Sequence, residues 1–141
     1  AKSFSVGNVD KKRQKLINVT RQCLLDAIEQ EVPGNRIGDI SHAVQTNAES
    51  HGYGVVRELV GHGIGTKLHE DPQIPNYGAP GKGPRIEVGM CFAIEPMINM
   101  GTPDIYTKQD GWTVCTKDGL PSAHFEHSIT ITENGAKILT E

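Results

Sequence analysis

The chain has 141 residues, 36% of them hydrophobic, and a formal net charge of -3 at pH 7. This length suits a single domain with a buried core, and the slightly acidic balance offers no general attraction for nucleic acid or anionic membranes. No apolar run approaches the roughly 20 residues of a membrane-spanning helix, so we expect no nucleic-acid partner and no membrane partner.

The cysteine pattern indicates a reducing environment. Cys23, Cys91 and Cys115 are odd in number, widely separated and without a Cys-x-x-Cys pair. Such a pattern argues against a disulfide framework or a structural zinc site. We therefore expect a cytoplasmic protein.

The first third of the chain predicts one short strand and two helices. Residues 1–7 (AKSFSVG) alternate apolar and polar side chains, as part of a strand does. Asp10 is a suitable N-cap for a helix that ends at Pro33-Gly34, and a second helix is predicted from about Asp39 to Gly52. The first helix gathers its apolar residues on one face: Leu16, Val19, Cys23, Leu24, Ala27 and Ile28.

The rest of the chain predicts a long loop followed by strands. Residues 61–89 are rich in glycine and proline, which favours a loop draped over a site. Residues 90–98 predict a buried strand, residues 106–116 a hairpin, and residues 123–132 another strand. Helices followed by antiparallel strands indicate an α+β fold, with the helices on one face of an antiparallel sheet.

Three residues are candidates for one polar site. His62 lies between glycines in GHGIGTKLHEDP, which indicates either a closely approached site or a flexible surface turn. Glu95 interrupts an apolar strand, and a buried carboxylate needs a partner. The period of two puts Glu126 on the polar face of its strand together with His124, although an ordinary exposed glutamate fits this pattern equally well.

Taken together, these three side chains indicate a metal site. Imidazole and carboxylate ligands suit zinc, manganese, iron or cobalt, and two such ions about 3.5–4 Å apart can activate a water molecule for hydrolysis. We expect His62, Glu95 and Glu126 to converge on one metal-sized volume.

Several motifs resemble the second half of type I methionine aminopeptidases, the enzymes that remove the initiator methionine. These motifs are GHGIG, LHEDPQIPNY, MCFAIEPMI and DGWTVCTKDGLPSAHFEHSITIT. The resemblance covers residues 1–141. It implies half or more of the pita-bread (creatinase/aminopeptidase) fold, and one domain that is the C-terminal part of the catalytic domain.

The resemblance also implies roles for individual residues. His62, Glu95 and Glu126 correspond to metal ligands of a site that holds two divalent ions (cobalt, manganese, iron or zinc) when complete. Glu95 would also handle protons, and His69 would be catalytic by binding the scissile carbonyl. Trp112 and Leu68, with His69, would contact the substrate, and the alternative for Trp112 is a core aromatic residue.

The sequence departs from the family in several places. Two aspartate ligands and the first half of the fold have no counterpart in this chain, so we expect fewer metal ions or none and weak or no activity for the chain alone. The missing half would lie on another chain or have been removed. Leu68 stands where phenylalanine is common, and His124 where glutamine is common.

The implied partners are the N-terminus of a nascent peptide and the ribosome. Two other functions stay open: a peptide- or protein-binding module without catalysis, and a proline-specific aminopeptidase with the same metal ligands. DGWTVCTKDG favours the methionine enzyme.

Overall fold

The computed structural model describes residues 1–140. Two helices are the first regular elements of the chain. Helix α1 (Lys11–Glu29) starts at Asp10, whose carboxylate accepts hydrogen bonds from the backbone N–H groups of Lys12 and Arg13. Its start and its apolar face are therefore as predicted. The buried residues of α1 are Leu16, Val19, Thr20, Cys23, Leu24 and Ala27.

Helix α2 (Ile37–Ser50) begins earlier than the sequence suggested. Asp39 is part of the first turn, where its Oδ2 accepts a hydrogen bond of 2.7 Å from the backbone N–H of Arg36. A carboxylate at this third helical position caps the backbone in front of it, as in a capping box. The residue expected to begin the helix is therefore its third residue.

Ten short strands form three antiparallel sheets within residues 1–140. The largest has the order β10-β9-β4-β2-β3, and the second has the order β1-β5-β8, while β6 and β7 pair as a hairpin. Their bounds are β1 (Gly54–Val55), β2 (Gly61–Gly63), β3 (Glu70–Ile74), β4 (Cys91–Ile94), β5 (Met97–Asn99), β6 (Ile105–Thr107), β7 (Val114–Thr116), β8 (Ser122–His124), β9 (His127–Thr132) and β10 (Gly135–Ile138).

Two segments predicted as single strands are each divided between the two larger sheets. Residues 90–98 form β4 and β5, with Glu95 and Pro96 between them, and residues 123–132 form β8 and β9, with Phe125 and Glu126 between them. The two breaks lie side by side, because the Phe125 N–H donates to the Pro96 carbonyl oxygen at 3.4 Å. The chain thus passes from one sheet to the other at Glu95 and again at Glu126.

The strand predicted for residues 1–7 is absent from the described structure, so that prediction was wrong. Only Lys2 forms a bridge, with Phe125, and the side chains of Phe4 and Val6 are 71% and 88% exposed. Alternation of apolar residues produces a strand only where a neighbouring strand supplies backbone partners, and none lies beside Phe4.

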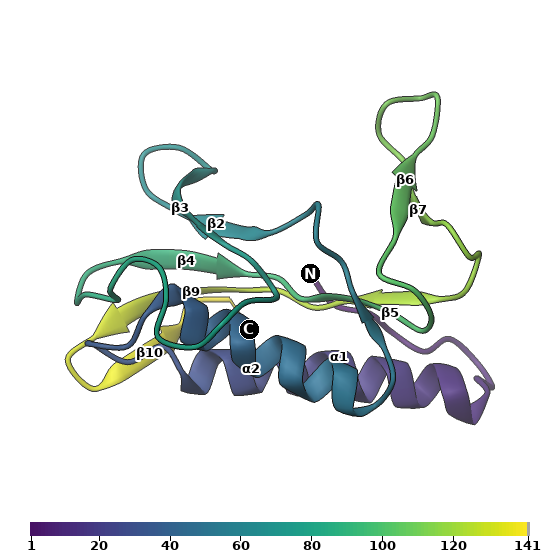
Figure 1. Ribbon diagram of the computed structural model, residues 1–141, viewed down its shortest axis with the longest axis horizontal. Helices are drawn as coiled ribbons and strands as arrows, with labels where there is room; N and C mark the ends of the chain where they lie inside the picture. The colour runs from purple at the N-terminus through teal and green to yellow at the C-terminus, as the bar shows by residue number, and fades with distance from the viewer. Residues whose placement is uncertain (141) are drawn as a thin grey trace.

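Both helices cover one face of the sheets, as predicted (Figure 1). A single cluster of buried residues fills the space between them, and it includes Leu16 and Val44 from the helices and Phe92 and Ile98 from the strands. The β2–β3 and β6–β7 segments project from the opposite side (Figure 1). No helix within residues 1–140 is long and apolar enough to cross a membrane, and the three cysteines are free.

Candidate metal centre

His62 lies on a strand and not on the loop that we predicted for residues 61–89. Strand β2 pairs with β3 on one side and β4 on the other, with His62 opposite Gln73 and Ala93. Its glycines are needed because the neighbouring backbones come close. A Cβ on Gly61 would collide with the Ala93 carbonyl oxygen, and a Cβ on Gly63 with that of Asp71. The glycines thus mark close approach of strands.

The His62 ring is oriented by its own strand. Its Nδ1 lies 2.9 Å from the Gly63 carbonyl oxygen, which can only accept a hydrogen bond, so Nδ1 carries the proton. The lone pair is then on Nε2. This nitrogen lies 3.5 Å from Glu95 Oε1, and the two side chains are only 11% and 17% exposed. A second group that holds Nδ1–H in this way is the usual support of a metal-binding histidine.

Glu95 faces two imidazoles. Its Oε1 faces His62, and its Oε2 lies 3.6 Å from Nε2 of His124. The backbone at Glu95 is held by Asn76, whose side-chain amide donates to the Glu95 carbonyl oxygen at 3.2 Å. Glu95 therefore lies at the crossing between the sheets, and each of its carboxylate oxygens faces the Nε2 atom of one histidine.

Glu126 completes the cluster from the second crossing. Glu95, His124 and Glu126 each offer a ligand atom, and these three atoms lie within 4.8 Å of one another. The backbone N–H of Glu126 donates to the Ala1 carbonyl oxygen at 2.9 Å, and the Ala1 amino group lies 3.3 Å from Glu126 Oε2. Glu95 thus lies near His62 on one side and near Glu126 on the other.

Without a cation, the charged forms of Glu95 and His124 are unfavourable in this cluster. Burial raises the pKa of Glu95 to about 7, and the nearby Glu126 carboxylate adds to this rise, while His62 opposes it. Burial also lowers the pKa of His124, although Glu126 acts in the opposite direction. A divalent ion would favour ionised Glu95 and neutral His124 at once.

The donor set fits a transition-metal ion. Carboxylate oxygens and neutral imidazole nitrogens are the ligands that zinc, iron and cobalt accept. The buried Nε2 of His124 has no hydrogen-bond partner among the described residues, and such an atom is costly unless it binds something. The residues that could hold an ion are thus His62, Glu95, His124 and Glu126.

His69 lies beside this centre, on the segment between β2 and β3 that also carries Leu68. The His69 ring is exposed, and its centroid lies 4.3 Å from that of His62. Both histidines line one surface pocket that is formed within residues 60–73. Leu68 does not line this pocket, and its side chain is 71% exposed.

Trp112 lies in the projecting hairpin, between β6 and β7. Its side chain is 87% exposed, so it is not part of the core that residues 1–140 form. Its backbone N–H donates to Asp110 Oδ1 at 2.9 Å, so the turn that carries it is ordered. Contact with a substrate is left as the role to be tested.

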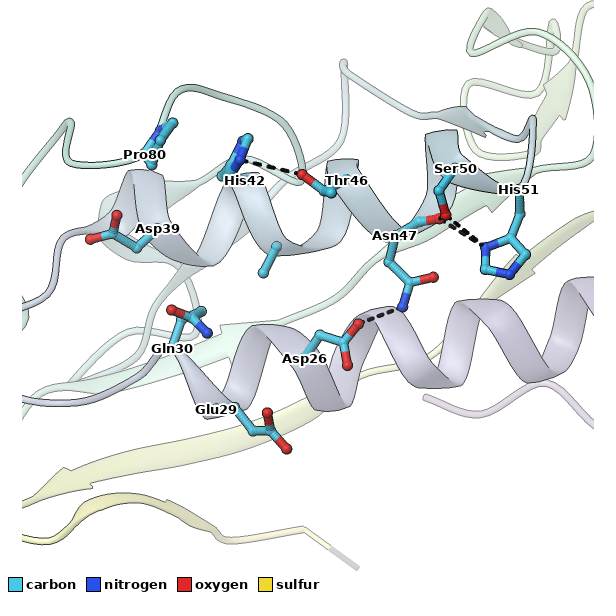
Figure 2. Close-up of a pocket in the computed structure, with 11 residues that line it drawn as sticks. Asp26, Glu29, Gln30, Asp39, His42, Thr46, Asn47, Ser50, His51 and Pro80 are labelled. Atoms are coloured by element: carbon cyan, nitrogen blue, oxygen red, sulfur yellow. Dashed lines mark hydrogen bonds between the residues drawn. The ribbon is translucent and has the colours of Figure 1, made fainter.

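A groove between the two helices is lined by residues of α1 and α2 with their C-caps and by Pro80 (Figure 2), none of which belongs to the metal centre. Its polar side chains largely bind one another. The Asn47 amide donates to Asp26, and Nδ1 of His51 lies 2.9 Å from the Asn47 carbonyl oxygen. These contacts join α1 to α2 and hold the end of α2, so they are structural.

His124 was not among the residues that we expected to bind metal. The sequence placed it on the polar face next to Glu126, and the resemblance marked it only as a departure from glutamine. The signal that could have identified it is its position two residues before Glu126, which puts the two side chains on the same side of the chain.

The match to a family model extends over residues 1–133 and defines the chain as a member of metallopeptidase family M24. Methionine aminopeptidases from Clostridium acetobutylicum and Bacillus subtilis are 49% and 52% identical to it over 99% and 98% of the chain. The chain spans about half the length of these relatives, 56% of each.

Solved structures agree with the sequence comparison. The methionine aminopeptidase of Thermotoga maritima has a TM-score of 0.96 at 53% identity and matches 98% of this chain and 55% of its own. The prolidase of Pyrococcus furiosus matches 98% of this chain and 35% of its own, with a TM-score of 0.75 at 27% identity. The predicted α+β pita-bread fold and the resemblance to methionine aminopeptidases are therefore confirmed.

Proposed function

We propose that this chain is the C-terminal part of the catalytic domain of a metal-dependent aminopeptidase that removes the initiator methionine from nascent proteins. The observation that carries the proposal is the position of Glu95 between two imidazoles and near a second carboxylate. The sequence identity of 49% and 52% to two methionine aminopeptidases supports an N-terminal methionine as the group removed.

The residues of this chain would hold a divalent ion (cobalt, manganese, iron or zinc) through His62, Glu95 and Glu126. Ions bound there would activate a water molecule and polarise the peptide carbonyl. The relatives' greater length leaves room for the ligands of a second ion.

Glu95 is also suited to proton transfer. Its side chain is only 17% exposed and lies between the imidazoles of His62 and His124, and a carboxylate placed beside the attacking water can act as a general base. It would accept the proton of the attacking water and deliver it to the leaving amine. His69, next to His62, would donate a hydrogen bond to the oxyanion that develops on the scissile carbonyl.

The substrate would be the N-terminus of a nascent peptide, with the ribosome as the partner that presents it and the cytoplasm as the location. Leu68 and Trp112 would contact the methionine side chain, because both are apolar and exposed. The presence of all three ligand residues argues against a binding module without catalysis.

The test is a chimera in which the part of the Bacillus subtilis relative that this chain lacks precedes residues 1–141. We expect it to release methionine from a Met-Ala-Ser peptide, to lose activity with a chelator and to regain it with cobalt or manganese, while residues 1–141 alone are weakly active or inactive. A folded chimera that cleaves Ala-Pro but not Met-Ala-Ser would refute the proposed substrate. One that cleaves neither peptide would refute the activity.

A further inference from the structure

His124 is brought to the metal centre by the pairing of two strands. It is the last residue of β8 and lies opposite Met97 of β5, two residues beyond Glu95. This register places its Nε2 at 3.6 Å from Glu95 Oε2. The position is thus set by the backbone and does not depend on a long, flexible side chain.

The reactive end of His124 is buried, whereas the rest of the ring is not. The side chain is 36% exposed as a whole, yet Nε2 is inaccessible and has no hydrogen-bond partner among residues 1–140. The distance to Glu95 is too long for a good hydrogen bond, for which about 2.7–3.2 Å is usual. The structure therefore holds a nitrogen donor at the centre that nothing in the described chain satisfies.

The spacing of the donors fits one shared ion. Two atoms that each lie about 2.0–2.2 Å from an ion cannot be more than about 4.4 Å apart. The separation of 3.6 Å between His124 Nε2 and Glu95 Oε2 satisfies this limit. The three donor atoms of Glu95, His124 and Glu126, all within 4.8 Å of one another, need only small side-chain rotations to meet it together.

We propose that His124 is a direct metal ligand through Nε2, on the ion that Glu95 and Glu126 hold, and that it makes the centre prefer imidazole-binding ions. The inference rests on the metal centre of the proposed function. An added nitrogen donor strengthens the binding of zinc, cobalt and nickel more than that of manganese or magnesium, because the latter prefer oxygen ligands. With His124, the metal centre would have two imidazole ligands, whereas His62 alone supplies one.

The competing explanation is that His124 only donates a hydrogen bond to Glu95. His124→Gln separates the two roles, because a glutamine amide can still donate to a carboxylate but does not replace an imidazole as a ligand. His42→Gln is the matched control. It makes the same change at an exposed histidine in the helical groove, away from the centre (Figure 2).

The experiment measures the affinities of Zn²⁺ and Mn²⁺ by competition with a chelating dye, and the visible absorption of the Co²⁺-loaded protein. The purified 141-residue chain is compared with His124→Gln, His42→Gln and Glu95→Gln, and circular dichroism checks that each is folded. We expect His124→Gln to weaken Zn²⁺ binding by at least about tenfold, to change Mn²⁺ binding by less than about threefold, and to alter the Co²⁺ spectrum. His42→Gln should change none of these.

The other outcomes overturn the inference in distinguishable ways. Loss of binding in Glu95→Gln with unchanged binding in His124→Gln refutes ligation by His124 and leaves the proposed metal centre intact. Equal weakening of both ions by His124→Gln, with an unaltered Co²⁺ spectrum, shows that His124 only positions Glu95. If the unsubstituted chain and Glu95→Gln bind an ion equally well, both the inference and the metal centre fail. If residues 1–141 bind no ion alone, the same four proteins are compared in the chimera, where equal binding by the unsubstituted protein and Glu95→Gln has the same meaning.

Discussion

His62 Nε2 lies 3.5 Å from Glu95 Oε1, and the hydrogen bond from Nδ1 to the Gly63 carbonyl holds the ring in that direction. A ring fixed in this way presents its lone pair to the centre before any ion arrives. His69 lies against the same ring but has no comparable contact with Glu95 in the described structure. The two histidines should therefore be separable by mutation.

In the active chimera, Glu95→Gln should reduce both metal content and turnover, because the carboxylate is proposed as ligand and as proton acceptor. His69→Ala should leave the metal content unchanged and lower kcat by about 10²–10³, the usual cost of removing one oxyanion donor. Elemental analysis and steady-state kinetics on Met-Ala-Ser measure the two quantities. Metal loss in His69→Ala, or full kcat, would contradict this division of roles.

Gly63→Ala should destabilise the fold by about 1–3 kcal/mol, because a new Cβ would overlap the fixed Asp71 carbonyl. Gly65→Ala is the matched control. There the new Cβ meets only the carboxylate of Glu70, which can rotate away, so the loss should be smaller. Urea unfolding followed by circular dichroism measures both, and equal losses would argue against the close β2–β3 approach.

Glu31 predicts an unusual dependence of stability on pH. The side chain is fully buried, neither carboxylate oxygen has a hydrogen-bond partner within residues 1–140, and burial raises its pKa from 4.5 to about 8. A pKa that is higher in the folded state means that folding favours the protonated form. Its contribution to stability is therefore complete below pH 4.5 and is lost as the pH rises through about 8.

Replacing Glu31 with Gln should remove this loss. At pH 8.5 the variant should be more stable than the unsubstituted chain by about 2–5 kcal/mol, and near pH 4.5 the difference should be small. The control is Glu29→Gln, because Glu29 is exposed. Urea denaturation at several pH values measures the difference. Parallel pH profiles of stability for all three proteins would show that burial does not raise the pKa of Glu31.

Trp112 should behave as a surface residue in stability and as a contact residue in catalysis. Trp112→Ala should change the free energy of unfolding by less than about 0.5 kcal/mol, as is usual for exposed positions, but raise KM in the chimera. Because it is the only tryptophan, fluorescence reports on it directly. We expect ready quenching by acrylamide in the folded chain, and protected fluorescence would place the indole in a core.

The start of the first helix and the unusual position of Glu95 were recognisable for local reasons. Asp10 and the apolar spacing of α1 specify that helix without tertiary information, and Glu95 was conspicuous because it interrupts an apolar run. The strand status of His62 was not predictable, because Gly61 and Gly63 carry no side chains and so no periodicity. Their pairing depends on β3 and β4, which are distant in sequence.

The burial of Glu31 and the position of His124 were hidden for a similar reason. Glu31 directly follows the helix in a polar stretch, where a glutamate is normally exposed, and only the fold encloses it. His124 reaches Glu95 through the register of β5 and β8. A sequence read alone gives the alternation of side chains but not which strand lies beside which.

The most direct test of the metal centre is anomalous diffraction from a crystal of the protein grown with Co²⁺. We expect an anomalous peak about 2.0–2.2 Å from donor atoms of Glu95 and Glu126, with His62 Nε2 and His124 Nε2 at the same centre. A crystal in which Co²⁺ is bound elsewhere while these side chains stay free of it would contradict the central claim.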